Sequence, residues 1–293
     1  MFTGSIPALV TPMLADGAID LSAWDRLLDF HLEEGSDALV VGGTTGESPT
    51  LDRAELEELI RRARRRAAGR VPVIAGSGTN GTAKAIALSR LCESAGADAL
   101  LLVTPYYNRP TQLGMRRHFA AIADSVGIPV ILYNVPGRTA CDLLPATVLE
   151  LAAHPRIVGI KEATGDLARI REIVAGAPTG FDVLSGDDPT AGQAMQHGAC
   201  GVISVTANVA PRSMHQRCAA ALAGRHADAG VIDAQLAELH TSLFVEPNPI
   251  PAKWALERLG LIGPGIRLPL TPLSAERRGE VEAAMRAAGI KLP

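Results

Sequence analysis

The sequence predicts an α/β fold, a (β/α)8 TIM barrel that is followed by a C-terminal helical extension. An amphipathic helical pattern, a glycine and a short aliphatic run recur along the chain, and eight such runs are present. Alternation of strands and helices indicates a parallel sheet, and eight strands can close into a barrel of about 250 residues. The 293 residues are therefore expected to form a single domain, with the barrel over about 1–224 and the added helices over about 225–293.

The predicted strands are apolar throughout, as expected for strands that are buried on both faces of a parallel sheet. They are Ile6–Thr11, Ala38–Val41, Val71–Ile74, Ala99–Val103, Val130–Tyr133, Ile157–Lys161, Phe181–Leu184 and Gly201–Val205. A doubly wound open sheet is the competing arrangement. It is disfavoured because no GxGxxG pattern follows the first run.

Helical patterns occupy the segments between these runs. The second helix begins after Asp52-x-x-Glu55, the signature of a capping box. Glycine at the residue after a helix adopts the left-handed conformation without strain, which predicts helix ends at Gly35, Gly69, Gly96, Gly127 and Gly198. After the eighth run, helical patterns cover Arg212–Ala223, Asp228–Phe244, Ala252–Leu259 and Ala275–Ala288.

The composition excludes several classes of partner. A net charge of −3 and a pI of about 6.2 favour neither nucleic acid nor an anionic membrane surface. No apolar run approaches the roughly 20 residues of a membrane helix. The four cysteines lie far apart without a CxxC pair, and the N-terminus lacks the basic start of a signal peptide, so a cytoplasmic protein is expected. The histidines show no metal-ligand spacing, and no metal site is predicted.

Polar residues gather just after the predicted strands, where the active sites of such barrels lie. Lys161 ends the sixth run, so its side chain is expected to rise from the barrel interior. Burial disfavours the charged ammonium form, and a neutral amine can attack a carbonyl group. The alternative is a lysine that extends to water at the barrel mouth. Neighbouring tyrosine and threonine hydroxyls, which can carry protons, favour the nucleophile.

Two other segments carry candidate ligand-binding groups. Gly42–Ser48 is glycine-rich, but Glu47 stands where a phosphate-binding loop requires lysine. Its two threonines either bind a carboxylate and relay a proton or belong to an ordinary turn. Tyr133 is either a proton carrier or a packing residue, and Arg138 either anchors a substrate carboxylate or is a surface cation.

The motifs GTTGES, YNVPGRT, GIKEATG and FVEPNPIP together resemble those of the dihydrodipicolinate synthase family, also called 4-hydroxy-tetrahydrodipicolinate synthase. The resemblance extends over nearly the whole chain. It implies a lyase that forms a Schiff base with pyruvate and condenses it with L-aspartate 4-semialdehyde, in lysine and diaminopimelate biosynthesis. It implies no cofactor, and a homo-oligomer that is at least a dimer and commonly a dimer of dimers.

The resemblance also implies roles for individual residues. Lys161 matches the imine-forming lysine, Tyr133 the central proton-relay tyrosine and Thr44 the hydroxyl beside it. Tyr107 matches a tyrosine that enters the partner subunit's site across a dimer interface. The implied substrate-binding positions are Thr45 and Ile203 for pyruvate, Arg138 for the carboxylate of the second substrate, and Gly186 for the wall of the lysine pocket.

A departure from the family pattern concerns feedback inhibition by lysine. The positions that match the inhibitor site are Ser48, Arg53, Leu56, Asn80, Lys84 and Tyr106. Inhibited members commonly have a carboxylate in place of Lys84 and histidines in place of Arg53 and Leu56. Because Lys84 repels the ammonium groups of the ligand, weak or absent inhibition is expected.

Two competing functions remain. Another pyruvate-type aldolase on the same barrel, such as N-acetylneuraminate lyase or a 2-keto-3-deoxy-sugar-acid aldolase, shares Lys161 and Tyr133. Arg138 suits a small carboxylated partner better than a polyhydroxylated chain. The other alternative is a non-catalytic barrel that binds a keto acid, which the intact set of lysine, tyrosines and threonine disfavours.

Overall fold

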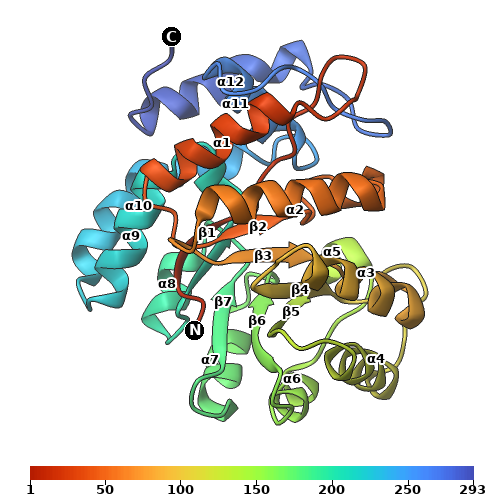
Figure 1. Ribbon diagram of the computed structural model, residues 1–293. Helices are drawn as coiled ribbons and strands as arrows, with labels where there is room; N and C mark the ends of the chain where they lie inside the picture. The colour runs from red at the N-terminus through yellow and green to blue at the C-terminus, as the bar shows by residue number, and fades with distance from the viewer.

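The computed structural model describes all 293 residues and forms a parallel barrel surrounded by helices (Figure 1). The strands are β1 (Gly4–Pro7), β2 (Leu39–Val41), β3 (Val73–Gly76), β4 (Ala99–Val103), β5 (Val130–Asn134), β6 (Ile157–Glu162), β7 (Asp182–Ser185) and β8 (Gly201–Ser204). Each strand from β2 to β8 pairs in parallel with the next, and β8 pairs with β1. The predicted TIM barrel is confirmed: β4 has the predicted bounds, and the bounds of the other strands differ by at most four residues.

The barrel closes between β1 and β2 through a few backbone contacts. A parallel bridge joins Ala8 to Val40. The Asp37 N–H donates to the Ser5 carbonyl and the Leu9 N–H donates to the Val40 carbonyl, each at 3.0 Å. These bonds leave the sheet without a free edge.

One principal helix follows each strand. In order these are α1 (Leu21–Glu33), α2 (Arg53–Ala67), α3 (Thr82–Ser94), α4 (Gln112–Asp124), α6 (Pro145–Leu151), α7 (Leu167–Gly176), α8 (Ala191–Gln196) and α9 (Pro211–Leu222). Short turns of helix lie at the strand ends: η1 (Ser48–Thr50), α5 (Pro136–Thr139) and η2 (Thr206–Asn208). The chain then continues into α10 (His226–Ser242), α11 (Ile250–Arg258) and α12 (Ala275–Ala287), drawn in blue in Figure 1.

Local sequence signals account for most helix ends. The capping box is present, since the Asp52 carboxylate accepts from the Glu55 N–H and the Glu55 carboxylate accepts from the Asp52 N–H. Four of the five predicted terminal glycines have left-handed φ angles. The prediction is wrong for Gly127, which does not. α4 ends earlier, at Asp124, and the Gly127 N–H instead donates to the Glu93 carboxylate at 2.7 Å.

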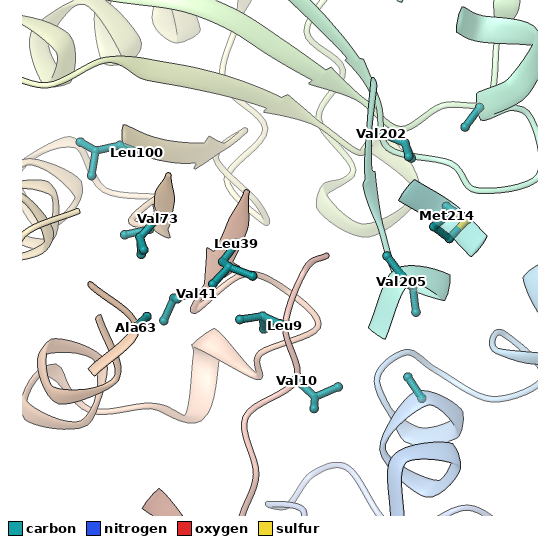
Figure 2. Packing of buried hydrophobic residues seen from close by; sticks show 14 of the residues in the cluster. Leu9, Val10, Leu39, Val41, Ala63, Val73, Leu100, Val202, Val205 and Met214 are labelled. Carbon is teal, nitrogen blue, oxygen red and sulfur yellow. The ribbon is translucent and has the colours of Figure 1, made fainter. Parts of the chain in front are cut away.

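Successive strand residues alternate between two apolar cores. Leu39 and Val41 point outward and pack with the helices, together with Val73 and Leu100 (Figure 2). Val40 points inward to a smaller core inside the barrel, which also contains Tyr133. Because β5 and β6 pair Tyr133 with Lys161, this alternation directs the lysine toward the barrel interior. None of the helices has the length and apolar character that crossing a membrane requires.

Candidate active site

Lys161 lies at the carboxyl end of β6, inside the barrel. Its side chain is only 6% exposed, and Nζ is 4.4 Å from the centroid of the Tyr133 ring. No carboxylate pairs with this amine, and no side chain or carbonyl accepts a hydrogen bond from it. An amine that is free of strong partners and largely removed from water is suited to attack a carbonyl group.

Gly186 forms the wall behind the Lys161 side chain. A Cβ atom at this position would lie 2.7 Å from Lys161 Cε and 2.5 Å from Ala163 Cβ. Both distances are well below van der Waals contact, which is about 3.5–4.0 Å for carbon. Only glycine therefore leaves room for the lysine, which accounts for the expected position of Gly186 in the lysine pocket.

A cavity of about 240 Å³ opens above Lys161. This is below the ~300–1,000 Å³ of pockets for drug-sized ligands, so it suits a small metabolite. Five of the predicted site residues line it in addition to the lysine: Thr44, Thr45, Tyr133, Arg138 and Gly186. The structure thus brings together hydroxyl groups, an amine and a guanidinium from the ends of three strands, β2, β5 and β6.

The hydroxyl group of Thr45 is oriented by a residue that the sequence analysis missed. Asn248, which lies between α10 and α11 and is buried, donates from Nδ2 to Thr45 Oγ1 at 3.0 Å. A hydroxyl group that accepts this bond keeps its own proton free for another acceptor. Both residues line the cavity, so the Thr45 proton can serve a bound anion. Asn248 belongs to the FVEPNPIP motif, which the sequence analysis used for the family resemblance without a role for this residue.

Arg138 supplies the cation at the mouth of the cavity. It lies in α5, a single helical turn that follows β5. Its guanidinium is exposed and has no carboxylate partner, in contrast to most arginines of α2. An unpaired guanidinium at a cavity mouth can bind a carboxylate with two parallel hydrogen bonds.

The Gly42–Ser48 loop is anchored to the C-terminal helices by a buried ion pair. Glu47, in the left-handed conformation with φ of 59°, pairs with Lys253 of α11, and its second oxygen accepts from the Arg267 N–H at 3.2 Å. Burial lowers the pKa of Lys253, against the opposing effect of the Glu47 carboxylate. Sequence reasoning noted Glu47 only as an exclusion of a phosphate loop, so this anchor is a second missed feature.

Two predicted site residues do not line the cavity. Ile203, in β8, belongs to the inner apolar core together with Tyr133. Tyr107 is 88% exposed and has a φ of 75°, and its N–H donates to the Thr139 carbonyl at 3.3 Å. Within one chain Tyr107 is therefore not joined to Thr44 and Tyr133.

A second cavity of about 310 Å³ adjoins the first and shares Thr44, Tyr133 and Arg138 with it. Four residues of the predicted lysine site line this cavity: Ser48, Arg53, Leu56 and Tyr106. Asn80 and Lys84 do not. The Asn80 carbonyl accepts from Asn108 Nδ2 at 2.8 Å, which fixes the loop that carries the two adjacent tyrosines.

A buried lysine amine lies at the carboxyl end of a (β/α)8 barrel, beside a phenol and a guanidinium that has no carboxylate partner. This arrangement defines a class of protein, the Schiff-base-forming barrel enzymes. Comparison with known proteins is consistent with this class. The family model described as the dihydrodipicolinate synthetase family matches residues 1–288. The chain belongs to this family.

Individual relatives match over almost their full length. A 4-hydroxy-tetrahydrodipicolinate synthase of Methylococcus capsulatus is 58% identical over 99% of this chain and 100% of its own. The chloride-inhibited dihydrodipicolinate synthase of Acinetobacter baumannii, crystallised with pyruvate, is 49% identical, covers 99% and 100% of the two chains and has a TM-score of 0.98. The enzyme of Cyanidioschyzon merolae with lysine bound is 39% identical over 99% of both chains, with a TM-score of 0.96.

Proposed function

We propose that the chain is a 4-hydroxy-tetrahydrodipicolinate synthase, a lyase that condenses pyruvate with L-aspartate 4-semialdehyde. The observation that carries this proposal is the buried Lys161 amine beside the Tyr133 ring, at the floor of a small cavity with a free guanidinium at its mouth. The full-length relatives of the same name support it. Arg138 favours a small carboxylated aldehyde over the polyhydroxylated substrates of the alternative aldolases.

The first half of the proposed reaction activates pyruvate. The Lys161 amine adds to the ketone carbon, and the resulting carbinolamine takes up a proton and loses its hydroxyl group as water to give a protonated imine. Tyr133 and Thr44 carry the protons for this step, and Thr45 holds the pyruvate carboxylate. The imine withdraws electrons from the adjacent methyl group, which loses a proton and leaves an enamine. Neither a metal nor an organic cofactor takes part in this proposal.

The second half forms the new carbon–carbon bond. The enamine carbon attacks the aldehyde carbon, and the aldehyde oxygen takes up a proton to become the 4-hydroxyl group. Arg138 holds the carboxylate of this second substrate. The amino group of the substrate then attacks the imine carbon, closes the ring and releases the Lys161 amine. One water molecule is released in the whole sequence, at imine formation.

We further propose that Tyr107 completes the proton relay of a partner subunit, so that the active unit is at least a dimer. Its almost complete exposure supports this, as does the left-handed backbone, which bulky residues rarely adopt without a constraint. A mixture of Lys161→Ala and Tyr107→Phe subunits tests the idea. Each variant alone is expected to be inactive or strongly impaired, whereas a mixed dimer has one intact site and regains up to about half the activity per dimer.

The four cysteines are free, which supports a reducing compartment such as the cytoplasm.

Trapping of the imine tests the proposed chemistry. Borohydride added with pyruvate is expected to attach a reduced three-carbon acid to Lys161 and to no other lysine, and mass spectrometry of the digested protein measures this. Turnover of aspartate semialdehyde must then exceed that of sugar-acid aldehydes. An adduct on another lysine, or pyruvate binding without turnover of any aldehyde, contradicts the proposal.

A further inference from the structure

The residues that follow Tyr133 and Lys161 lie on the opposite face of the sheet. The register pairs Tyr133 with Lys161 and, one residue on, Asn134 with Glu162. Because side chains alternate along a strand, the first pair faces the cavity and the second faces the surrounding helices. Asn134 and Glu162 are both buried, and Asn134 Nδ2 donates to Glu162 Oε2 at 3.0 Å. One side-chain hydrogen bond thus joins the two strands directly behind the proposed reacting groups.

Every hydrogen-bonding group of the Asn134 amide has a partner. Oδ1 accepts from the Leu143 N–H at 2.9 Å, and Nδ2 donates to Asp142 Oδ1 at 2.9 Å as well as to Glu162. The remaining oxygen of Glu162 accepts from the Thr164 N–H at 2.9 Å. A buried amide with three satisfied bonds has one available orientation, which makes it a rigid link rather than a mobile contact.

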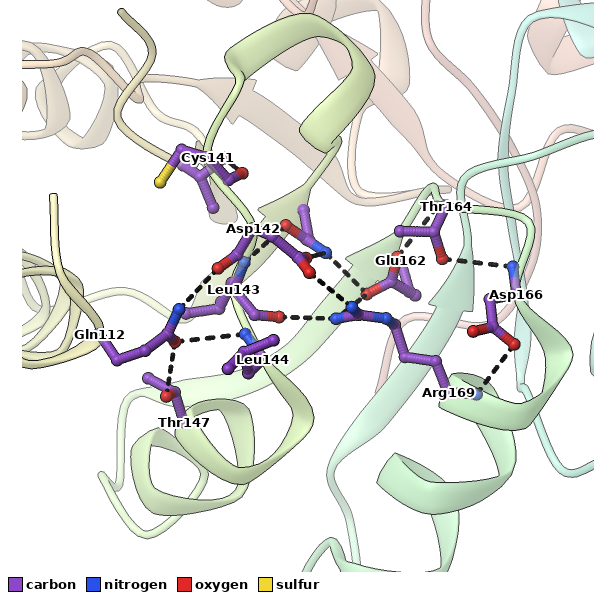
Figure 3. Close-up of polar contacts among 12 residues, drawn as sticks. Gln112, Cys141, Asp142, Leu143, Leu144, Thr147, Glu162, Thr164, Asp166 and Arg169 are labelled. Carbon is purple, nitrogen blue, oxygen red and sulfur yellow. Dashed lines mark hydrogen bonds and ion pairs between the residues drawn. The ribbon is translucent and has the colours of Figure 1, made fainter. Parts of the chain in front are cut away.

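Arg169 of α7 closes the network from outside (Figure 3). It donates to Asp142 Oδ2 at 2.7 Å and to the Leu143 carbonyl at 3.0 Å, and it lies 3.9 Å from Glu162 Oε2. This cation offsets part of the cost of burying the Glu162 carboxylate, since an unpaired buried carboxylate is strongly disfavoured. Burial raises the pKa of Glu162, while the bonds from Asn134 and Thr164 and the charge of Arg169 oppose that rise.

The backbone ladder between β5 and β6 ends just beyond the Asn134–Glu162 pair. Its register is irregular between Val130 and Ile131, at the amino end of β5, and regular from Ile131 to Asn134. Beyond the Asn134–Glu162 pair, one further bond, from the Ala163 N–H to the Asn134 carbonyl at 3.0 Å, ends the ladder. A shift in register would also turn side chains to the other face. The side-chain link is therefore placed where it fixes the relative position of the two strand ends.

We propose that Asn134 and Glu162 are positioning residues for imine formation, because their hydrogen bond on the outer face of the sheet fixes the Tyr133 phenol relative to the Lys161 amine on the inner face. The inference rests on the proposed function, which assigns chemistry to the inner pair. Neither residue touches substrate, so their effect passes through the strands alone. Loss of the link is expected to slow the pyruvate half of the reaction without weakening the aldehyde site at Arg138.

The test compares two equivalent amide-to-acid substitutions in the same network. Asn134→Asp keeps the acceptor for the Leu143 N–H and replaces the donor to Glu162 by an oxygen. Gln112→Glu makes the same change in α4, where Nε2 donates to the Asp142 carbonyl at 2.7 Å and Oε1 accepts from Thr147 Oγ1 at 2.7 Å. Gln112 thus braces the Asp142–Thr147 segment but does not touch β5 or β6.

The measured quantities are the single-turnover rate of the borohydride-trapped pyruvate adduct, the KM for the aldehyde and the melting temperature. Displacement of a reacting group by about 1 Å can cost about 10²-fold in rate, so N134D is expected to form the imine about 100-fold more slowly with a nearly unchanged aldehyde KM. Q112E is expected to form the imine at a rate within about threefold of the wild-type rate, even if its melting temperature falls as much as that of N134D. E162Q, which loses one of two acceptors, provides a second variant and is expected to slow the step more than about tenfold.

The outcomes separate this inference from the function on which it rests. If the wild-type protein forms no adduct on Lys161, the proposed function fails. If the wild-type protein forms it and N134D and E162Q do so at the same rate, only the positioning role is overturned. Equal slowing by Q112E also overturns it, because the network then acts on general stability. If N134D does not fold, the rate for E162Q decides the question.

Discussion

The replacement Gly186→Ala should inactivate the enzyme through Lys161 rather than through the backbone. The backbone of Gly186 is not left-handed, so alanine can adopt it. The added Cβ lies 2.7 Å from Lys161 Cε and 3.0 Å from Cγ, and Ala163 Cβ at 2.5 Å prevents a shift to the other side. Normal carbon contacts are about 3.5–4.0 Å, so the lysine stem must move by roughly 1 Å. A displacement of that size is expected to lower the rate by about 10²-fold.

The assay is the rate of pyruvate adduct formation under borohydride, followed by mass spectrometry, together with the melting temperature. Overpacking typically costs about 1–3 kcal/mol, so some loss of stability accompanies the effect. Gly279→Ala in α12 is the matched control, because no atom lies within 4 Å of its Cβ position. The control should retain full activity and equal or higher stability. If G186A forms the adduct at the wild-type rate, the steric reasoning is wrong.

Three further predictions concern other parts of the molecule. L-Lysine at millimolar concentration should reduce the activity of the wild type less than twofold, and Lys84→Glu should make the enzyme more sensitive to inhibition by L-lysine. Strong inhibition of the wild type at lower concentration contradicts the expected weak inhibition. Lys253→Met should destabilise the protein by about 3–5 kcal/mol in urea, because Glu47 is left buried without a partner, and the double variant with Glu47→Gln should recover most of that loss. Full burial lowers the pKa of His31 to about 3 from 6.5, so the unfolded chain binds a proton that the folded chain excludes. His31 should therefore lower the stability by about 2 kcal/mol between pH 6.5 and 5.0, and His31→Gln should reduce the measured fall by that amount in urea titrations at the two pH values.

Local patterns in the sequence were sufficient for the barrel and for the inner face of the site. Apolar runs located the strands, and the position of Lys161 at the end of the sixth run predicted a side chain inside the barrel, where the strand register sets it beside Tyr133. The sequence could not reveal contacts that depend on tertiary packing. Asn248 and Thr45 are 203 residues apart, and Lys253 and Glu47 are 206 apart. Neither pair has a short-range signature in the sequence.

These two distant contacts indicate why the barrel carries additional helices after β8. Glycine gives the Gly42–Ser48 loop access to a small ligand but contributes no side chain to hold the loop in place. Asn248 bonds to the Thr45 hydroxyl group and Lys253 pairs with Glu47, so two anchors of the loop come from the C-terminal segment, in addition to the bond that Thr11 Oγ1 donates to the Gly46 carbonyl at 2.7 Å. The barrel strands supply the amine and the phenol, whereas the helices after the barrel orient the hydroxyl that is proposed to hold the pyruvate carboxylate. Removal of α11 should therefore weaken pyruvate binding even where the eight strands remain folded.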